Sequence, residues 1–208
     1  MSGAFDPRRL LGLPAVYQAL ARILGAKDTR DRFKRDYLKL RTGERILDIG
    51  CGPADILASL PLDVDYTGFD MEPRYIQAAS HRYGDRGRFM VRAVSPDATA
   101  DLGTFDLVMA IGVLHHLTDA QADIIFASAA RILKPGGRLV TYDGAFVPGQ
   151  SLVARLLLKL DRGRHVRPAP AYATLARRHF AQVETHVVHD FLVLPYTLCI
   201  LRVSEPLA

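Results

Sequence analysis

A regular alternation of short apolar runs and amphipathic segments constrains the fold of this chain more than any other feature. The apolar runs have the length of buried strands, and the segments between them have the periodicity of helices. The predicted strands are 45–49, 65–69, 88–92, 105–110 and 138–142, and the predicted helices are 14–25, 29–40, 53–60, 73–83 and 119–133. Such units form right-handed crossovers, so we expect a mostly parallel, doubly wound α/β sheet of the Rossmann-like kind.

The regular alternation of predicted strands and helices ends after residue 145. A helix with a strongly apolar face is predicted over 149–161, followed by a basic loop at 161–167 and a helix over 169–180. Two strand-like runs, 183–191 and 196–203, complete the chain. Their short connection leaves no room for a crossover helix, so they are predicted to form an antiparallel edge hairpin, which gives a sheet of seven strands.

A glycine-rich turn follows the first predicted strand. Open α/β sheets bind their ligands at the carboxyl ends of the strands. Gly50 and Gly52 let the backbone pass close to a ligand, where a Cβ atom would collide with it. About twenty residues later Asp70 ends the second strand, where its carboxylate can accept hydrogen bonds from ribose hydroxyls. The turn and the acid together predict a nucleoside ligand.

The charges around this turn distinguish between classes of nucleoside. Asp55 stands where a dinucleotide-binding turn needs its third glycine, and Asp48 lies two residues before Gly50. Carboxylates at this place oppose a pyrophosphate and favour a ligand with cationic groups. S-adenosylmethionine, which has an ammonium and a sulfonium, fits this pattern better than NAD does.

Four stretches, 46–55, 70–73, 105–117 and 131–140, resemble the class I S-adenosylmethionine-dependent methyltransferases of the small-molecule type. The resemblance covers roughly residues 44–142. It implies that Asp70 holds the ribose and that Met71 packs on the adenine, although the acid often found after the third strand is missing unless Asp97 supplies it. The glycine turn, its charges and the resemblance together give these expected cofactor-binding residues: Asp48, Gly50, Cys51, Gly52, Asp55, Asp70, Met71, Tyr75, Ala93, Val94, Ala110 and Ile111.

Two histidines follow the fourth predicted strand, and similar methyltransferases place this position over the transferable methyl group. Methyl transfer depends mainly on the position of the acceptor, and a base is needed only if the acceptor must lose a proton. His115 and His116 are the candidate bases, and Asp143 can orient one of them. The alternative is that one histidine caps the next helix and the other is merely exposed.

The acceptor is expected to meet the segments that flank the core. Arg162, Arg164 and Arg167 can grip an anionic group, or they form a solvated loop. Tyr17 and Tyr172 can line the acceptor pocket, although aromatic side chains on helices more often pack in a core. The apolar helix before the basic loop can instead form a dimer contact or touch a membrane.

The chain is predicted to form one methyltransferase domain, residues 1–208. Its parts are an N-terminal helical cap (1–42), a cofactor-binding core (43–145), an acceptor-side insertion (146–170) and a C-terminal helix with strands (171–208). With two cysteines, a net charge of +5 and no long uncharged apolar stretch, we expect a cytoplasmic monomer or homodimer without an integral membrane segment. No metal is expected, because Gly112 stands where related enzymes have a first ligand.

The expected function is S-adenosylmethionine-dependent methylation of a small molecule. The expected acceptor atom is an oxygen, and an anionic acceptor is among the candidates. Nucleic acid is not expected, because residues 110–113 lack the Pro-Pro-aromatic segment that sandwiches a flipped base. Methylation of RNA or protein, binding of S-adenosylmethionine without catalysis, and NAD-dependent oxidoreduction are the alternatives.

Overall fold

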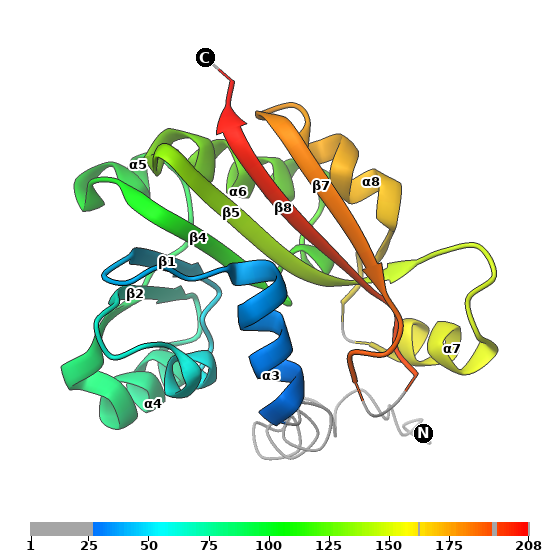
Figure 1. Cartoon of the computed structure of the whole chain (residues 1–208), viewed down its shortest axis with the longest axis horizontal. Helices are drawn as coiled ribbons and strands as arrows, with labels where there is room; N and C mark the ends of the chain where they lie inside the picture. Colours follow the sequence, from blue (N-terminus) through cyan, green and yellow to red (C-terminus); the bar gives the residue numbers. More distant parts are fainter. Residues whose placement is uncertain (1–26, 162, 193–194, 208) are drawn as a thin grey trace, which may run out of the picture.

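One twisted sheet forms the centre of the structure, a computed structural model that describes residues 27–161, 163–192 and 195–207 (Figure 1). The strands are β1 (Arg45–Ile49), β2 (Asp65–Asp70), β3 (Gly87–Val91), β4 (Phe105–Ile111), β5 (Leu133–Phe146), β6 (Arg167–Pro168), β7 (Phe180–Val188) and β8 (Leu198–Pro206). The five strands predicted for the core are confirmed to within a few residues, except that β5 is longer at both ends. The predicted helix over 14–25 lies outside the described residues.

The strand order is β3-β2-β1-β4-β5-β8-β7, with the short β6 paired in parallel to β5. Strands β1 to β5 are parallel to their neighbours, whereas β8 runs antiparallel to both β5 and β7. The chain winds outward in opposite directions from β1 and from β4, so the switch point lies between these two strands. The doubly wound fold and the antiparallel C-terminal strands are confirmed.

Helices cover both faces of the sheet (Figure 1). The helical segments are α3 (Lys27–Phe33), η1 (Lys34–Leu38), η2 (Asp55–Ser59), α4 (Pro73–Tyr83), η3 (Gly84–Arg86), α5 (Pro96–Thr99), η4 (Ala100–Leu102), η5 (Leu114–His116), α6 (Asp119–Ile132), α7 (Leu152–Leu160) and α8 (Ala169–Ala176). Ile46 packs in the cluster with α3, η2 and α4, and its neighbour Leu47 packs in the cluster with α6 and α8. The alternation of strand side chains thus gives the sheet two buried faces.

Two predicted helices, the one after the glycine turn and the one before β7, are clearly shorter in the structure. The segment after the glycine turn is only the 3₁₀ helix η2, because Ala54 adopts a left-handed conformation (φ 56°) and the helix cannot start at Pro53. Helix α6 begins at Asp119, as predicted, and Thr118 caps it, since its side chain accepts from the backbone N–H of Gln121. The helix predicted to reach Phe180 ends at Ala176, and Phe180 begins β7 instead.

A buried arginine joins the start of the chain's described part to the sheet. Arg138 on β5 forms an ion pair with Glu44 (Nη1–Oε1 2.8 Å), and its Nε donates to the carbonyl of Leu38 at 2.8 Å. Burial is tolerated here because the guanidinium is both paired and hydrogen bonded. These contacts fix the end of η1, and with it the carboxyl end of the α3–η1 segment, against the sheet.

Candidate active site

The glycine turn after β1 is tied to the end of β2, as the sequence predicted. Gly50 (φ 71°) and Gly52 (φ 54°) both occupy the left-handed region, where glycine is favoured. The backbone N–H of Gly52 donates to Oδ2 of Asp70 at 2.9 Å, and Cys51 N–H donates to the carbonyl of Phe69 at 2.8 Å. Asp70 therefore stands directly beside the turn, at the carboxyl edge of the sheet.

Asp48 lies beneath this turn and is almost fully buried. The hydroxyl of Tyr66 donates to its Oδ2 at 2.6 Å. Burial raises the pKa of Asp48 to about 7, against the opposing effect of the Tyr66 hydrogen bond. The carboxylate is thus kept under the turn at a free-energy cost, which is typical of groups retained for function.

Asp55 does not take the place that the sequence suggested. Its carboxylate forms an ion pair with Arg82 of α4 (Oδ1–Nη1 2.6 Å), and both side chains are about half exposed. Because Arg82 neutralises this charge outside the crevice, Asp55 cannot be used to exclude a pyrophosphate. Instead, the left-handed backbone conformation after Gly52 and Pro53 is that of Ala54, a residue not predicted to belong to the site.

The remaining predicted cofactor residues lie at or near the same edge. Met71 is exposed just after Asp70, Tyr75 is partly buried on α4, and Ala93 and Val94 lie in the loop that follows β3. Ala110 is buried near the end of β4, whereas the next residue, Ile111, is partly exposed and lines a cavity.

His115 is buried between two carboxylates. Its Nδ1 lies 2.8 Å from Oδ1 of Asp143, and its Nε2 lies 3.5 Å from Oδ1 of Asp161. Burial disfavours the imidazolium, but the hydrogen bonds to the two aspartates outweigh it and raise the pKa of His115 to about 9. A histidine that is already protonated at neutral pH is not suited to accept a proton, so this environment disfavours His115 as the general base.

His116 has a different environment. It is exposed, and its ring centroid lies 4.1 Å from that of His115. Of the two predicted bases, His116 is therefore the one that solvent and a small molecule can reach. Asp143, which is buried on β5, orients His115, since its Oδ1 also accepts from the backbone N–H of His115 at 3.1 Å.

Arg167 stabilises the turn that carries His115 and His116 (the histidine turn), and its side chain does not face solvent. Its buried guanidinium donates to the carbonyls of Leu114 (2.7 Å) and Leu117 (2.6 Å) and pairs with Asp119 (2.8 Å). The predicted role of Arg167 in binding the acceptor is corrected to a structural one. Arg164 is exposed, and Arg162 lies outside the described residues.

Tyr172 is likewise a core residue. It is almost fully buried on α8, and its hydroxyl donates to the carbonyl of Gly144 at 3.0 Å. A side chain whose polar end is already bonded inside the core does not line a pocket, so its expected acceptor contact was wrong. Tyr17, the other predicted aromatic, lies outside the described residues.

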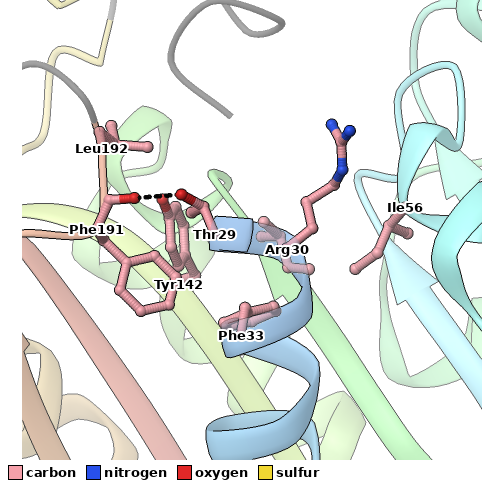
Figure 2. Close-up of a pocket in the computed structure, with 8 residues that line it drawn as sticks. Thr29, Arg30, Phe33, Ile56, Tyr142, Phe191 and Leu192 are labelled. Atoms are coloured by element: carbon pink, nitrogen blue, oxygen red, sulfur yellow. Dashed lines mark hydrogen bonds between the residues drawn. The ribbon is translucent and has the colours of Figure 1, made fainter. Parts of the chain in front are cut away.

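A cavity of about 190 Å³ opens at the carboxyl edge, between α3 and the ends of β4 and β5 (Figure 2). It is lined by Thr29, Arg30, Phe33, Ile56, Ile111, Tyr142, Phe191 and Leu192. Thr29 Oγ1 donates to the carbonyl of Phe191 at 2.7 Å and closes one side. Of these residues only Ile111 was predicted from the sequence, because they come from five separate segments of the chain.

Aromatic rings form most of one wall of this cavity. The centroid of Phe33 lies 5.4 Å from that of Tyr142 and 6.3 Å from that of Phe191, in edge-to-face arrangements. Such rings present a large, rigid apolar surface. On the opposite side Ile56 follows the glycine turn directly, so the cavity adjoins the predicted cofactor crevice (Figure 2).

Neither a metal cluster nor a membrane span is found in the part of the chain that the structure describes. No group of three or more His, Cys, Asp or Glu side chains is arranged to hold a metal ion in these segments. Among the described helices, none has the length and apolar character needed to cross a membrane.

Known proteins resemble both the sequence and the fold. Residues 46–137 match a methyltransferase domain family. The chain is 36% identical over 122 residues to the 27-O-demethylrifamycin SV methyltransferase of Amycolatopsis mediterranei, which covers 53% of this chain and 42% of that protein. It is 31% identical over 181 residues to a ubiquinone biosynthesis O-methyltransferase of Xanthomonas oryzae pv. oryzae, covering 77% of this chain and 72% of the relative.

A solved structure has the same fold. The N-methyltransferase NodS of Bradyrhizobium japonicum, in complex with S-adenosyl-l-homocysteine, aligns with a TM-score of 0.64 at 21% identity, over 97% of this chain and 93% of NodS. Together with the relatives, the glycine turn and Asp70 define a class I methyltransferase. The chain belongs to the S-adenosylmethionine-dependent methyltransferases that act on small molecules.

The residues at the turn fit this cofactor. A Cβ atom on Gly52 would meet no atom within 4 Å, so Gly52 faces open space, whereas one on Gly50 would lie 2.6 Å from Cγ2 of Val113. Asp70 lies against the turn with its second oxygen bonded to the N–H of Glu72 at 2.8 Å, and the buried Asp48 lies below it. Among the described residues no basic side chain bonds to either carboxylate, and such carboxylates suit a cationic nucleoside.

Proposed function

We propose that this methyltransferase methylates a hydroxyl oxygen of an apolar aromatic small molecule that carries an acidic group. The cavity between α3 and the ends of β4 and β5 is the observation that carries the proposal, because its wall is aromatic and it adjoins the glycine turn. Two relatives are an O-methyltransferase of ubiquinone biosynthesis and a methyltransferase that acts on 27-O-demethylrifamycin SV, which supports an oxygen acceptor.

The cavity suits a flat ring. Phe33, Tyr142 and Phe191 offer edges and faces against which an aromatic acceptor can pack, and Ile56 and Ile111 complete an apolar lining. Pockets of this kind bind mainly through apolar contact, and a few polar groups fix the orientation. Thr29 and Arg30 supply the polar groups here.

Arg30 is the candidate anchor for an acidic group. Its side chain is exposed at the rim, and in Figure 2 the guanidinium points away from the aromatic wall and into the open side. Within the described residues Arg30 forms no ion pair, whereas Arg32, two residues on, is paired with Asp190 at 3.1 Å. An unpaired guanidinium can form a bidentate pair with a carboxylate.

The acceptor hydroxyl must lose its proton as the methyl group is transferred. S-adenosylmethionine supplies an activated methyl group, so the protein's part is to position the acceptor and to take up this proton. His116 is exposed next to the buried His115 and is our candidate for the base. Asp143 and His115 act through it by fixing the turn that carries it.

A two-part experiment tests this function. Calorimetry should detect binding of S-adenosylmethionine and of S-adenosylhomocysteine. Mass spectrometry of a panel of phenols, with and without a carboxylate, should then detect a product 14 Da heavier, with the acidic phenols preferred. Binding of the cofactor without turnover of any phenol would overturn the proposed acceptor and favour amine acceptors or a non-catalytic protein. The cytoplasmic location and the oligomeric state stay predictions.

A further inference from the structure

The outer face of α7 is unusually apolar. Leu152, Val153, Leu156 and Leu160 are 84%, 54%, 56% and 43% exposed. The helix packs on the protein only through its other face, where Ala154 and Leu158 are buried and Leu158 contacts Gly144 of β5. Four neighbouring apolar side chains on one exposed helix face are typical of an interaction surface and not of scattered surface residues.

The exposed charged side chains of α7 and of the described part of the loop after it are cations. Between Gly144 and Val183 the sequence has seven arginines and lysines and a single acid, Asp161, although the net charge of the whole chain is only +5. Arg155 and Lys159 lie on the exposed side of α7 itself, and Arg164 is exposed in the loop that follows. Arg167 is buried and paired with Asp119, so the described cations at this surface are Arg155, Lys159 and Arg164.

The single acid of this segment faces inward. Asp161 accepts from the hydroxyl of Tyr196 at 2.9 Å and from the N–H of Gly163 at 2.7 Å, and it faces His115. These bonds also fix the carboxyl end of α7, and Ser151 caps its other end by accepting from the N–H of Ala154. The helix thus presents leucines and cations, without an opposing carboxylate, from a preformed position.

We propose that α7 is an interfacial helix that docks this protein on an anionic lipid surface. Leucines that enter the boundary of the acyl chains, flanked by cations that meet anionic headgroups, are the features that bind a helix flat on a membrane. A bound nucleic acid would contact the cations but would not account for the exposed leucines. A second copy of the chain would bring the same cations against one another, which opposes a symmetric contact through this face.

The position of α7 agrees with such docking. In Figure 1 α7 and α3 lie at the same edge of the molecule, where the carboxyl ends of the parallel strands meet. The segment between β7 and β8 connects the two regions, since Phe191 lines the cavity and Tyr196 bonds to Asp161. The lipid surface would then face the edge that carries the cavity, although the docking itself does not rest on the proposed acceptor.

Sedimentation with lipid vesicles tests the proposal on the full chain. We expect the protein to pellet with vesicles of phosphatidylcholine and phosphatidylglycerol, and to bind at least tenfold more weakly to phosphatidylcholine alone. Binding should weaken as NaCl is raised, because exposed charges are screened. Equal binding to neutral and anionic vesicles, or no binding to either, overturns the proposal.

Matched variants assign the binding to α7. L152Q/L156Q and R155Q/K159Q should each reduce binding at least tenfold, whereas L62Q and R131Q, which change an exposed leucine and an exposed arginine elsewhere, should not. Thermal unfolding checks that all variants are folded. If the α7 variants bind vesicles as the wild type does, the inference is wrong. It is also wrong if light scattering shows a dimer that L152Q/L156Q abolishes while vesicle binding is absent.

Discussion

The imidazole of His115 and the carboxylate of Asp143 form a buried hydrogen bond of 2.8 Å that joins the histidine turn to β5. A second carboxylate, Asp161, lies 3.5 Å from the other ring nitrogen. The loop after α7 closes over this pair, since the N–H of His165 donates to the carbonyl of His115 at 2.9 Å and a side chain at Gly163 would collide with the ring. His115 thus connects the core to the segment that carries α7.

This pair predicts a loss of stability at alkaline pH. The pKa of His115 is raised to about 9 from an unfolded value near 6.5, so its contribution is fully present below about pH 6.5 and is lost as pH rises through 9. We expect the free energy of unfolding to fall by about 2–3 kcal/mol between pH 7 and 10. Urea titrations at several pH values measure this fall in the free energy of unfolding.

His115→Asn supplies the comparison for this prediction. The variant should be less stable at pH 7 and should lack most of the alkaline decline, whereas His116→Asn, a change at the exposed neighbour, should keep it. An unchanged pH profile in His115→Asn would show that the histidine is not charged in the folded protein.

The exposed position of Arg30 predicts that the enzyme prefers acidic acceptors to neutral ones. Arg30→Gln should raise KM for an acidic phenol by about tenfold, since a hydrogen bond to a charged group contributes about 1.5–3 kcal/mol. KM for a neutral phenol and the Kd of S-adenosylmethionine should be unchanged. Steady-state kinetics on a matched pair of phenols makes this measurement, with Arg131→Gln on α6 as the control. Equal effects on both phenols would argue against an anchoring role.

The burial of Asp48 predicts that its carboxylate lowers the stability of the protein but strengthens the binding of the cofactor. Burial raises its pKa to about 7 from 3.8, so the folded protein loses stability as pH rises from about 4 to 7. Asp48→Asn removes this cost and should stabilise the free protein at pH 8 by about 2–4 kcal/mol, with no gain at pH 4. Calorimetry should show weaker binding of S-adenosylmethionine. Equal stability at pH 8 would mean that the carboxylate is not strained by burial.

The left-handed conformation of Ala54 predicts that a glycine at this position makes the protein more stable. Its left-handed conformation (φ 56°, ψ 35°) costs a residue with a Cβ about 1 kcal/mol. Ala54→Gly should therefore raise the free energy of unfolding by about 0.5–1 kcal/mol, whereas Ala79→Gly, at an equally buried position in the regular helix α4, should lower it by about 1 kcal/mol. Destabilisation of similar size in both variants would contradict this reading of the turn.

Local pattern was sufficient to predict the sheet and the glycine turn. Strands β1 and β4 are short, mainly apolar runs of the length of a buried strand, and Gly50 and Gly52 adopt a conformation that other residues avoid. The closeness of Asp70 to Gly52 followed from the rule that neighbouring parallel strands end at one edge. These features depend on few residues, all near one another in the sequence or in the sheet.

Side-chain directions outside the sheet could not be predicted in the same way. Asp55, Arg167 and Tyr172 each have partners that lie 27 or more residues away, and those partners decide whether the side chain faces a ligand or the protein. The cavity was missed for a related reason. Its aromatic wall combines Phe33, Tyr142 and Phe191, which only the folded chain brings together.

The anchoring of the α3–η1 segment by Arg138 has a mechanical consequence. The bond from Arg138 to the carbonyl of Leu38 fixes one end, whereas Thr29, Arg30 and Phe33 line the cavity from the other end. Between these ends the segment is held by the buried Phe33 and by Lys34, whose Nζ donates to the carbonyl of Ser59 at 2.8 Å. A substitution of Arg138 would therefore act on the cavity through this segment, whose cavity end is held by the hydrogen bond from Thr29 to Phe191.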